Sequence, residues 1–266
     1  MMIDCHTHLS RSNHPGQTFV SIRDSLLSSM ARQGIDYSLV YPDSESDAGV
    51  ADLETTRGVV EGNPKLRMLG TIALPDPDPG ILGRLDQLAL SGKIVGIKLY
   101  PGFELFSPDQ SACYPVYELC LKHNLAVVFH SGESMHEEWR EEYNHPRRIA
   151  QTADAFPRLR IVIAHFSQPH LMDCRDIILS KANVYADISG LADAEVEACC
   201  GKAAIRAVLE DVARGQPTKI LFGTDWPICG VSDHIALVKS LAISDATKAR
   251  ILSENADAVF GLALRS

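Results

Sequence analysis

Two histidines separated by one residue end the first apolar segment of the chain. The segment Met2-Ile3-Asp4-Cys5-His6-Thr7-His8 contains a buried strand, residues 2–6, that delivers His6 and His8 at its end. Side chains two residues apart on a strand point to the same side, so both imidazoles can be directed at one point. This arrangement indicates two ligands of a divalent metal, provided that later segments supply the others.

Later apolar segments also end in side chains that can carry chemistry. They are Lys98 in 94–99, His130 in 125–130, His165 after 160–164, Asp187 in 183–188 and Asp225 after 219–223. Each alone has an ordinary explanation as a cap, a turn residue or a solvent-facing cation. Packing does not require all of them at strand ends, so they indicate one site. Asp187 is either a structural partner of a histidine from the first strand or a residue of the rim.

The pattern of strands and helices predicts how these residues are positioned. The strand candidates are 2–6, 35–41, 67–74, 94–99, 125–130, 160–164, 183–188 and 219–223. Helical spacing occurs in Ser21–Gln33, Ile81–Leu90, Tyr114–His123, Pro146–Phe156 and Glu195–Ala213, with one or two closing helices in 243–264. This alternation predicts a single-domain α/β fold over 1–266, a (β/α)8 TIM barrel with its site at the C-terminal ends of the strands. An open doubly wound sheet is the weaker alternative, because no GxGxxG motif follows the first strand.

Composition narrows the classes of partner. A formal charge of −9 argues against nucleic acid or an anionic membrane surface. Membrane helices need about 20 consecutive apolar residues, and the sequence has no such stretch. The seven cysteines are scattered without CxxC spacing, which favours reduced thiols in a cytoplasmic protein. We therefore expect a cytoplasmic enzyme with a small-molecule substrate, and the sequence leaves a homo-oligomer open.

The order of these residues resembles the amidohydrolase superfamily. The motifs Asp4-Cys5-His6-Thr7-His8, Gly96-Ile97-Lys98-Leu99, His145-Pro146, the run Phe156–His165 and Gly223-Thr224-Asp225-Trp226-Pro227, with Glu254-Asn255-Ala256 near the end, are similar to its amidohydrolase-related (amidohydrolase 2) branch. That branch contains metal-dependent hydrolases and non-oxidative decarboxylases. The resemblance extends from Ile3 to Leu262, and the chain leaves no room for the flanking β-sandwich of many cyclic-amide hydrolases.

The resemblance implies a ligand set and catalytic roles. The metal ligands would be His6, His8, His130 and Asp225. These ligands suit one divalent metal, which we expect to be Zn²⁺. Mn²⁺, Fe²⁺ and Ni²⁺ are also compatible with them, and the sequence leaves a second metal open. The metal would activate a water molecule whose proton Asp225 accepts. His165 would polarise the scissile group, transfer a proton or ligate a second metal. Lys98 could be carboxylated between two metals or remain an ammonium that binds a substrate carboxylate, and the second role is favoured.

Residues of the loops that follow the strands are expected to contact the substrate. They are Tyr100, Ser131, Glu133 and Trp226. The stretch Glu133–Asn144 is a candidate lid over the site, and His145 is expected to be a capping or solvent-facing residue.

The sequence thus predicts a metal-dependent hydrolase that uses a metal-activated water to cleave a small amide, lactone or ester. The alternative is a lyase, a metal-dependent non-oxidative decarboxylase or hydratase of an aromatic or unsaturated carboxylic acid. A non-catalytic barrel that keeps a structural metal is a third class, disfavoured because its ligands lie on an open rim.

Overall fold

The computed structural model describes residues 1–44, 49–133 and 140–264, and it confirms the (β/α)8 barrel. In these ranges the strands are β1 (Ile3–Thr7), β2 (Tyr37–Val40), β3 (Leu66–Met68), β4 (Gly70–Thr71), β5 (Gly96–Leu99), β6 (Ala126–Phe129), β7 (Arg160–Ile163), β8 (Val184–Asp187) and β9 (Ile220–Leu221). All pairs are parallel, in the orders β1-β2-β3 and β4-β5-β6-β7-β8-β9.

Backbone hydrogen bonds at two seams join these sheets into a ring. The strands β3 and β4 are two halves of the predicted segment 67–74, and between them the Leu69 amide donates to the Val40 carbonyl at 3.1 Å. At the other seam the Cys5 amide donates to the Phe222 carbonyl at 2.9 Å, and Thr7 pairs in parallel with Trp226. The closed ring rules out the open doubly wound sheet.

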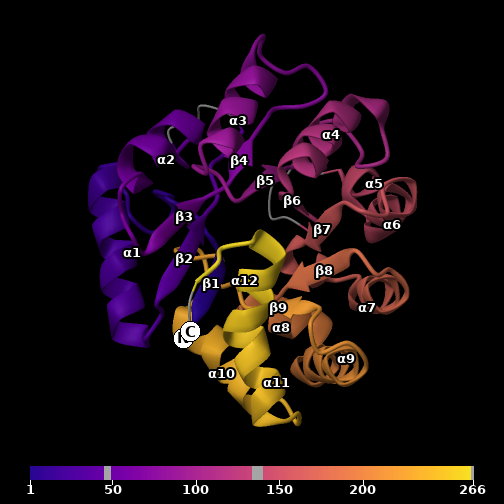
Figure 1. Cartoon of the computed structure of the whole chain (residues 1–266). Coiled ribbons are helices and arrows are strands. Elements are labelled where there is room, and N and C mark those ends of the chain that lie inside the picture. The colour runs from indigo at the N-terminus through magenta and orange to yellow at the C-terminus, as the bar shows by residue number, and fades with distance from the viewer. Residues whose placement is uncertain (45–48, 134–139, 265–266) are drawn as a thin grey trace.

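Helices surround the strands (Figure 1). They are α1 (Phe19–Gln33), α2 (Leu53–Val60), α3 (Ile81–Leu90), α4 (Tyr114–His123), α5 (Glu141–Asn144), α6 (Pro146–Ala155), α7 (Leu171–Ser180), α8 (Ala194–Cys200), α9 (Lys202–Gly215), α10 (Val231–Ser240), α11 (Asp245–Ala249) and α12 (Asn255–Phe260). Short turns are η1 (Ser111–Cys113), η2 (Ala164–Ser167) and the π-helical η3 (Arg250–Glu254). The predicted bounds of α3 and α4 are confirmed.

The helix expected over Glu195–Ala213 is instead two helices, α8 and α9. They meet at Gly201, whose φ of 82° is in the left-handed region that glycine adopts readily. The helix α9 buries apolar side chains, whereas no residue of α8 is buried, so the two helices pack differently. Gly201 was the signal in the sequence that one helix does not continue through this point.

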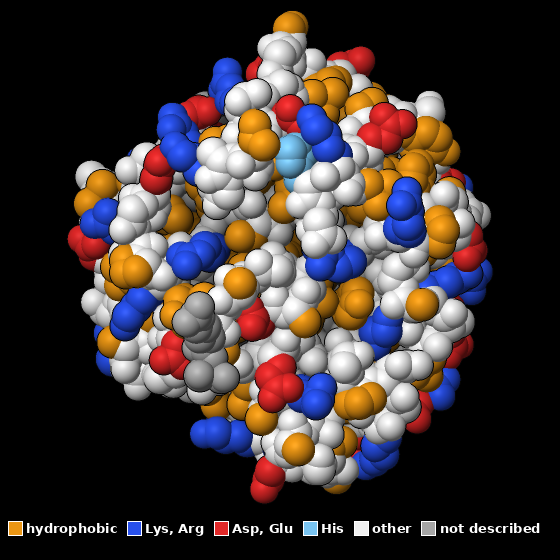
Figure 2. Space-filling model, viewed as in Figure 1, with side chains coloured by type: hydrophobic (Ala, Val, Ile, Leu, Met, Phe, Trp, Pro, Cys, Tyr) orange, Lys and Arg blue, Asp and Glu red, His pale blue; other side chains and the backbone are white. Residues whose placement is uncertain are grey.

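The closing helices cover the N-terminal end of the barrel, onto which Figure 1 looks. The Arg160 guanidinium at the start of β7 donates to the Ala258 carbonyl of α12, and Asn255 donates to the Ile220 carbonyl of β9 at 2.8 Å. On this face Lys and Arg side chains are interspersed with Asp and Glu (Figure 2). The opposite end, where the strands finish, holds the candidate site.

In the described part of the chain no helix combines the length and apolarity that crossing a membrane requires.

Candidate metal centre

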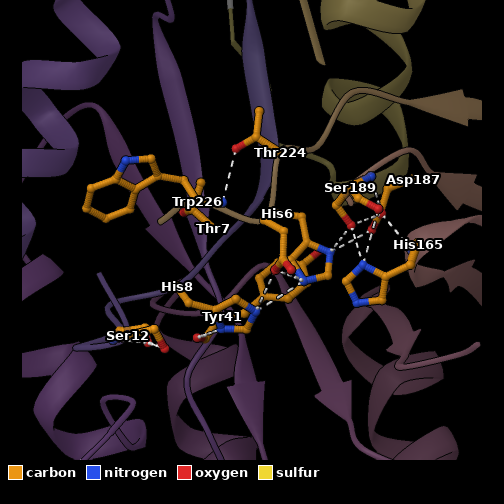
Figure 3. A network of polar contacts seen from close by, with 12 residues as sticks. His6, Thr7, His8, Ser12, Tyr41, His165, Asp187, Ser189, Thr224 and Trp226 are labelled. Carbon is orange, nitrogen blue, oxygen red and sulfur yellow. Dashed lines mark hydrogen bonds and ion pairs between the residues drawn. The ribbon is translucent and has the colours of Figure 1, made fainter. Parts of the chain in front are cut away.

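The structure brings His6, His8 and Asp225 together where β1 ends beside the segment that follows β9. Figure 3 shows the two histidines. The Nε2 atoms of His6 and His8 lie 3.2 Å apart. Asp225 Oδ1 lies 3.6 Å from His6 Nε2 and 3.4 Å from His8 Nε2. Three donor atoms of the types that bind zinc or manganese therefore converge on one point, as predicted from the strand ends.

Hydrogen bonds on the far side of each ring fix which nitrogen carries the proton. His6 Nδ1 lies 2.9 Å from Asp187 Oδ2, and His8 Nδ1 lies 3.0 Å from the Tyr41 carbonyl oxygen. Because a carboxylate and a carbonyl only accept, each Nδ1 donates and each Nε2 keeps a lone pair. Burial lowers the pKa of His6 to about 3, which keeps this ring neutral. Two lone pairs 3.2 Å apart repel unless a cation lies between them, so the residues fit a divalent metal.

Asp187 at the end of β8 orients His6, and it also lies with His6 and His165 in a second group whose ligand atoms are within 4.8 Å of one another. Its carboxylate accepts from His6 Nδ1, from the His165 amide at 3.0 Å, from the Ser189 amide at 3.1 Å and from the Ser189 hydroxyl. With both oxygens engaged, Asp187 is a structural partner of a β1 histidine. The sequence analysis overlooked Ser189, although its position two residues beyond Asp187 on a strand end was the available signal.

Asp225 owes its position to a tightly held turn after β9. Its amide donates to the His6 carbonyl at 2.8 Å, and its φ of 64° is left-handed, which is costly for a residue other than glycine. Asp4 of β1 stabilises the same turn, since its carboxylate accepts from the Thr224 hydroxyl at 2.6 Å and from the Thr224 amide at 3.0 Å. Asp225 Oδ1 is buried and accepts no hydrogen bond from a described residue, as expected of an atom kept for a cation.

His130 and His165 lie beside this group. Their ring centroids are 5.0 Å apart, and the His165 ring is 4.8 Å from that of His6. His130 is not within 4.8 Å of all three converging atoms, but its Nε2 is buried and has no hydrogen-bond partner in the described ranges. Burial lowers its pKa well below the ordinary value, so it too offers a lone pair.

Lys98 of β5 lies inside the barrel below these histidines. It is fully buried, and its Nζ has no hydrogen-bond partner among the described residues. The nitrogen lies 5.3 Å from the ring centroid of Tyr41 and 5.2 Å from that of Tyr100. Burial lowers the pKa of Lys98 to about 8, although Asp187 and Asp225 favour the charged form.

The residues expected to contact substrate have other partners in this structure. The Tyr100 hydroxyl donates to the Pro42 carbonyl at 2.7 Å, and the Ser131 hydroxyl donates to the Asn144 carbonyl at 2.9 Å. The backbone of Glu133 pairs with Gln168, and Trp226 is buried with its ring 5.4 Å from that of His14. Contact of these four with a substrate stays a prediction. The candidate lid contains residues 134–139, which are outside the described residues.

The structure is thus a closed barrel that gathers imidazoles, carboxylates and a buried lysine at the C-terminal end of its strands. The profile of the family described as Amidohydrolase matches residues 3–262, so the chain belongs to the amidohydrolase family, in agreement with the resemblance of its motifs. A search of curated protein sequences found no match.

Solved structures with the same fold share little sequence with this chain. An uncharacterised TIM-barrel protein of Bordetella bronchiseptica has a TM-score of 0.79 at 18% identity, covering 99% of both chains. A 4-oxalomesaconate hydratase of Rhodopseudomonas palustris has a TM-score of 0.70 at 16% identity, covering 98% of this chain and 96% of its own. A dihydroxybenzoic acid decarboxylase of Polaromonas, solved with manganese and an inhibitor bound, has a TM-score of 0.67 at 15% identity, covering 99% and 98%.

Proposed function

We propose that this protein is a metal-dependent lyase that decarboxylates or hydrates a small aromatic or unsaturated carboxylic acid. The observation that carries the proposal is the buried ammonium group of Lys98, which has no hydrogen-bond acceptor among the described residues and lies next to the candidate metal centre. A buried cation without a hydrogen-bond acceptor is costly, and a substrate carboxylate would supply the acceptor. The hydratase and the decarboxylase among the solved structures, whose names denote carboxylic acids, support the same direction.

The charges of the site favour an anionic substrate. Asp187 and Asp225 face Lys98 closely enough to affect its pKa. A substrate carboxylate would accept from the Lys98 ammonium, whereas a neutral ester or amide would leave that buried charge without an anionic partner from the substrate.

The residues divide the work of such a reaction. A divalent metal held by His6, His8, Asp225 and His130 would supply Lewis-acid polarisation of an oxygen ligand. Lys98, which lies inside the barrel, would bind the carboxylate of the substrate. His165 Nδ1 lies 2.9 Å from the Ser189 hydroxyl, which itself donates to Asp187, so His165 Nδ1 donates its proton there and Nε2 is left to accept or deliver one. Decarboxylation and hydration both place one proton on carbon, and His165 Nε2 would take this proton from a water molecule and pass it to the carbon.

Hydrolysis, which the sequence analysis expected first, becomes the second candidate. The description of the matching family as Amidohydrolase favours it. The same metal site would serve a hydrolase, but a buried cation next to the site is unnecessary for a neutral amide, lactone or ester. The manganese in the related decarboxylase makes Mn²⁺ as suitable a choice as the Zn²⁺ first expected.

The test is turnover by protein loaded separately with Mn²⁺ and Zn²⁺. Aromatic and unsaturated carboxylic acids are assayed for CO₂ release or loss of the double bond, beside neutral lactones, esters and amides. We expect turnover on acids, with a KM that rises at least tenfold in Lys98→Met and less in Lys98→Arg. Turnover confined to neutral substrates, with an unchanged KM in Lys98→Met, would replace the lyase by the hydrolase.

A further inference from the structure

A second group of metal-ligating side chains lies outside the barrel site. Its members are Glu141 of α5, His145 between α5 and α6, and His170 at the start of α7. Each offers one ligand atom, and the three atoms lie within 4.8 Å of one another. The group therefore joins the segment that follows β6 to the segment that follows β7.

The imidazole rings of His145 and His170 are neighbours, but no hydrogen bond joins them. Their ring centroids are 4.4 Å apart, at an interplanar angle of 44°. His170 Nε2 is 2.7 Å from Glu141 Oε1, yet this contact lacks the direction of a hydrogen bond and the nitrogen has no other partner in the described chain. Asp173 of α7 adds a carboxylate, with its Oδ2 3.5 Å from His145 Nε2.

We propose that Glu141, His145 and His170 bind a transition-metal ion such as Zn²⁺, with Asp173 within reach as a fourth ligand. Two imidazoles and one or two carboxylates are a donor set that suits zinc, which binds them at about 2.0–2.2 Å in a tetrahedral arrangement. The side chains of His145 and His170 are 24% and 23% exposed and that of Glu141 is 48% exposed, so the group lies at the protein surface. Burial and the neighbouring His170 lower the pKa of His145, which keeps a ring lone pair available at neutral pH.

The simpler explanation is a pair of ion pairs, Glu141 with His170 and Asp173 with His145, that bind no metal. One contact separates the two explanations. His145 Nδ1 accepts from the Arg147 amide at 3.3 Å and caps α6, so its proton is on Nε2. Coordination through Nε2 moves that proton to Nδ1 and ends this long contact. Zinc binding through Nε2 therefore changes the tautomer of His145, whereas ion pairing does not.

The ion would strengthen a junction that the backbone already forms. The Glu133 amide donates to the Gln168 carbonyl at 2.7 Å, and the Ser131 and Ser167 hydroxyls are 2.7 Å apart. At Gly132 even a single methyl group would collide with the Gln168 carbonyl oxygen. These two segments begin at His130 and His165, so a bound ion would hold the loops that carry both residues of the barrel site.

The test is a Zn²⁺ titration of metal-stripped protein against a chromophoric chelator. In His6→Ala, which disables the barrel site, we expect the protein still to bind one equivalent of Zn²⁺. Adding Glu141→Gln, a change at a half-exposed side chain, should lower the affinity for this Zn²⁺ at least tenfold. Adding His170→Gln instead should abolish its binding. The matched control is His123→Gln, which removes a histidine paired with Asp86 on α3 and should change nothing.

A spectroscopic readout makes the ligands visible. Co²⁺ in the His6→Ala protein should give the visible absorption of a low-coordinate site, and this absorption should disappear in His170→Gln. No zinc equivalent in His6→Ala, or an equivalent equally strong in Glu141→Gln and His170→Gln, would overturn the proposal. Because these outcomes concern only the second equivalent, they are independent of the proposed lyase activity, which depends on the first.

Discussion

At the scale of single residues, the site depends on how protons are distributed on its imidazoles. Asp187 accepts from four donors, one of which is His6 Nδ1, so it holds His6 with the proton on Nδ1. Tyr41 does the same for His8 through a backbone carbonyl that no side-chain substitution can remove. Asp187 is therefore the point at which the tautomers can be tested by mutation.

The substitution Asp187→Asn should lower metal affinity about 10- to 100-fold, the usual cost of losing such a supporting carboxylate. The asparagine side chain can accept from His6 Nδ1 only through its oxygen. Its NH₂ group then faces the backbone amides of His165 and Ser189, which are donors too, and this contact is unfavourable. Affinity is measured by competition with a chelator of known strength. The surface variant Asp24→Asn is the control, and equal affinities in the two variants would show that Asp187 does not orient His6.

Lys98 predicts a stability that depends on pH in the metal-free protein. Its pKa is about 8 in the folded state and 10.5 when unfolded, so between these values the unfolded chain binds more protons and stability rises with pH. At pH 7 the buried charge is a cost, and Lys98→Met should raise the free energy of unfolding by up to about 3 kcal/mol. Urea unfolding with chelator present, at pH 7 and pH 10, should show this gain shrinking at the higher pH. A gain that is the same at both values would mean that Lys98 does not titrate in this range.

At the scale of elements, the site requires β9 and β1 to approach each other closely. A Cβ atom at Gly223 would lie 2.8 Å from His6 Cβ, a distance that real side chains do not tolerate. The residue therefore sets the spacing between the strand that carries the two histidines and the turn that carries Asp225.

The substitution Gly223→Ala should cost about 1–3 kcal/mol of stability and weaken metal binding, because β9 must move away from His6. Gly58→Ala is the matched control: Gly58 lies in α2, and a methyl group added there would meet open space, so alanine should stabilise the protein by about 0.4–1 kcal/mol. Urea unfolding and the chelator competition measure both effects. Equal stability of the two variants would contradict the spacing argument.

The sequence predicted elements best where one signal dominated. Apolar runs ending in His, Lys or Asp marked strands and their direction, and the helical spacing predicted over Ser21–Gln33 ended where α1 ends. Contacts between distant segments were not predictable, because spacing along one segment says nothing of its neighbours. The bond from Ser189 to His165, the Asp4–Thr224 pair and the approach of His145 to His170 are of this kind.

At the scale of the molecule, the barrel gathers at one end residues from nearly the whole length of the chain. His6 and His8 come from the first strand and Asp225 from the turn after the last, and these two segments meet only because the ring closes. Binding at this centre is therefore coupled to the folding of the entire barrel, since the unfolded chain does not assemble the ligands.

This coupling predicts a metal-dependent melting temperature. At a free metal concentration 100 times the Kd, a site present only in the folded state adds about 2.7 kcal/mol of stability. For a chain of this size each kcal/mol shifts the Tm by about 2–4 °C, so Mn²⁺ or Zn²⁺ should raise it by about 5–10 °C and a chelator should reverse the rise. The measurement is made in His170→Gln, so that the second site adds nothing. Asp225→Asn is compared in the same background because asparagine also tolerates the left-handed backbone at that position. The shift should nearly vanish with Asp225→Asn. An undiminished shift would place the stabilising ion elsewhere and remove Asp225 from the ligand set.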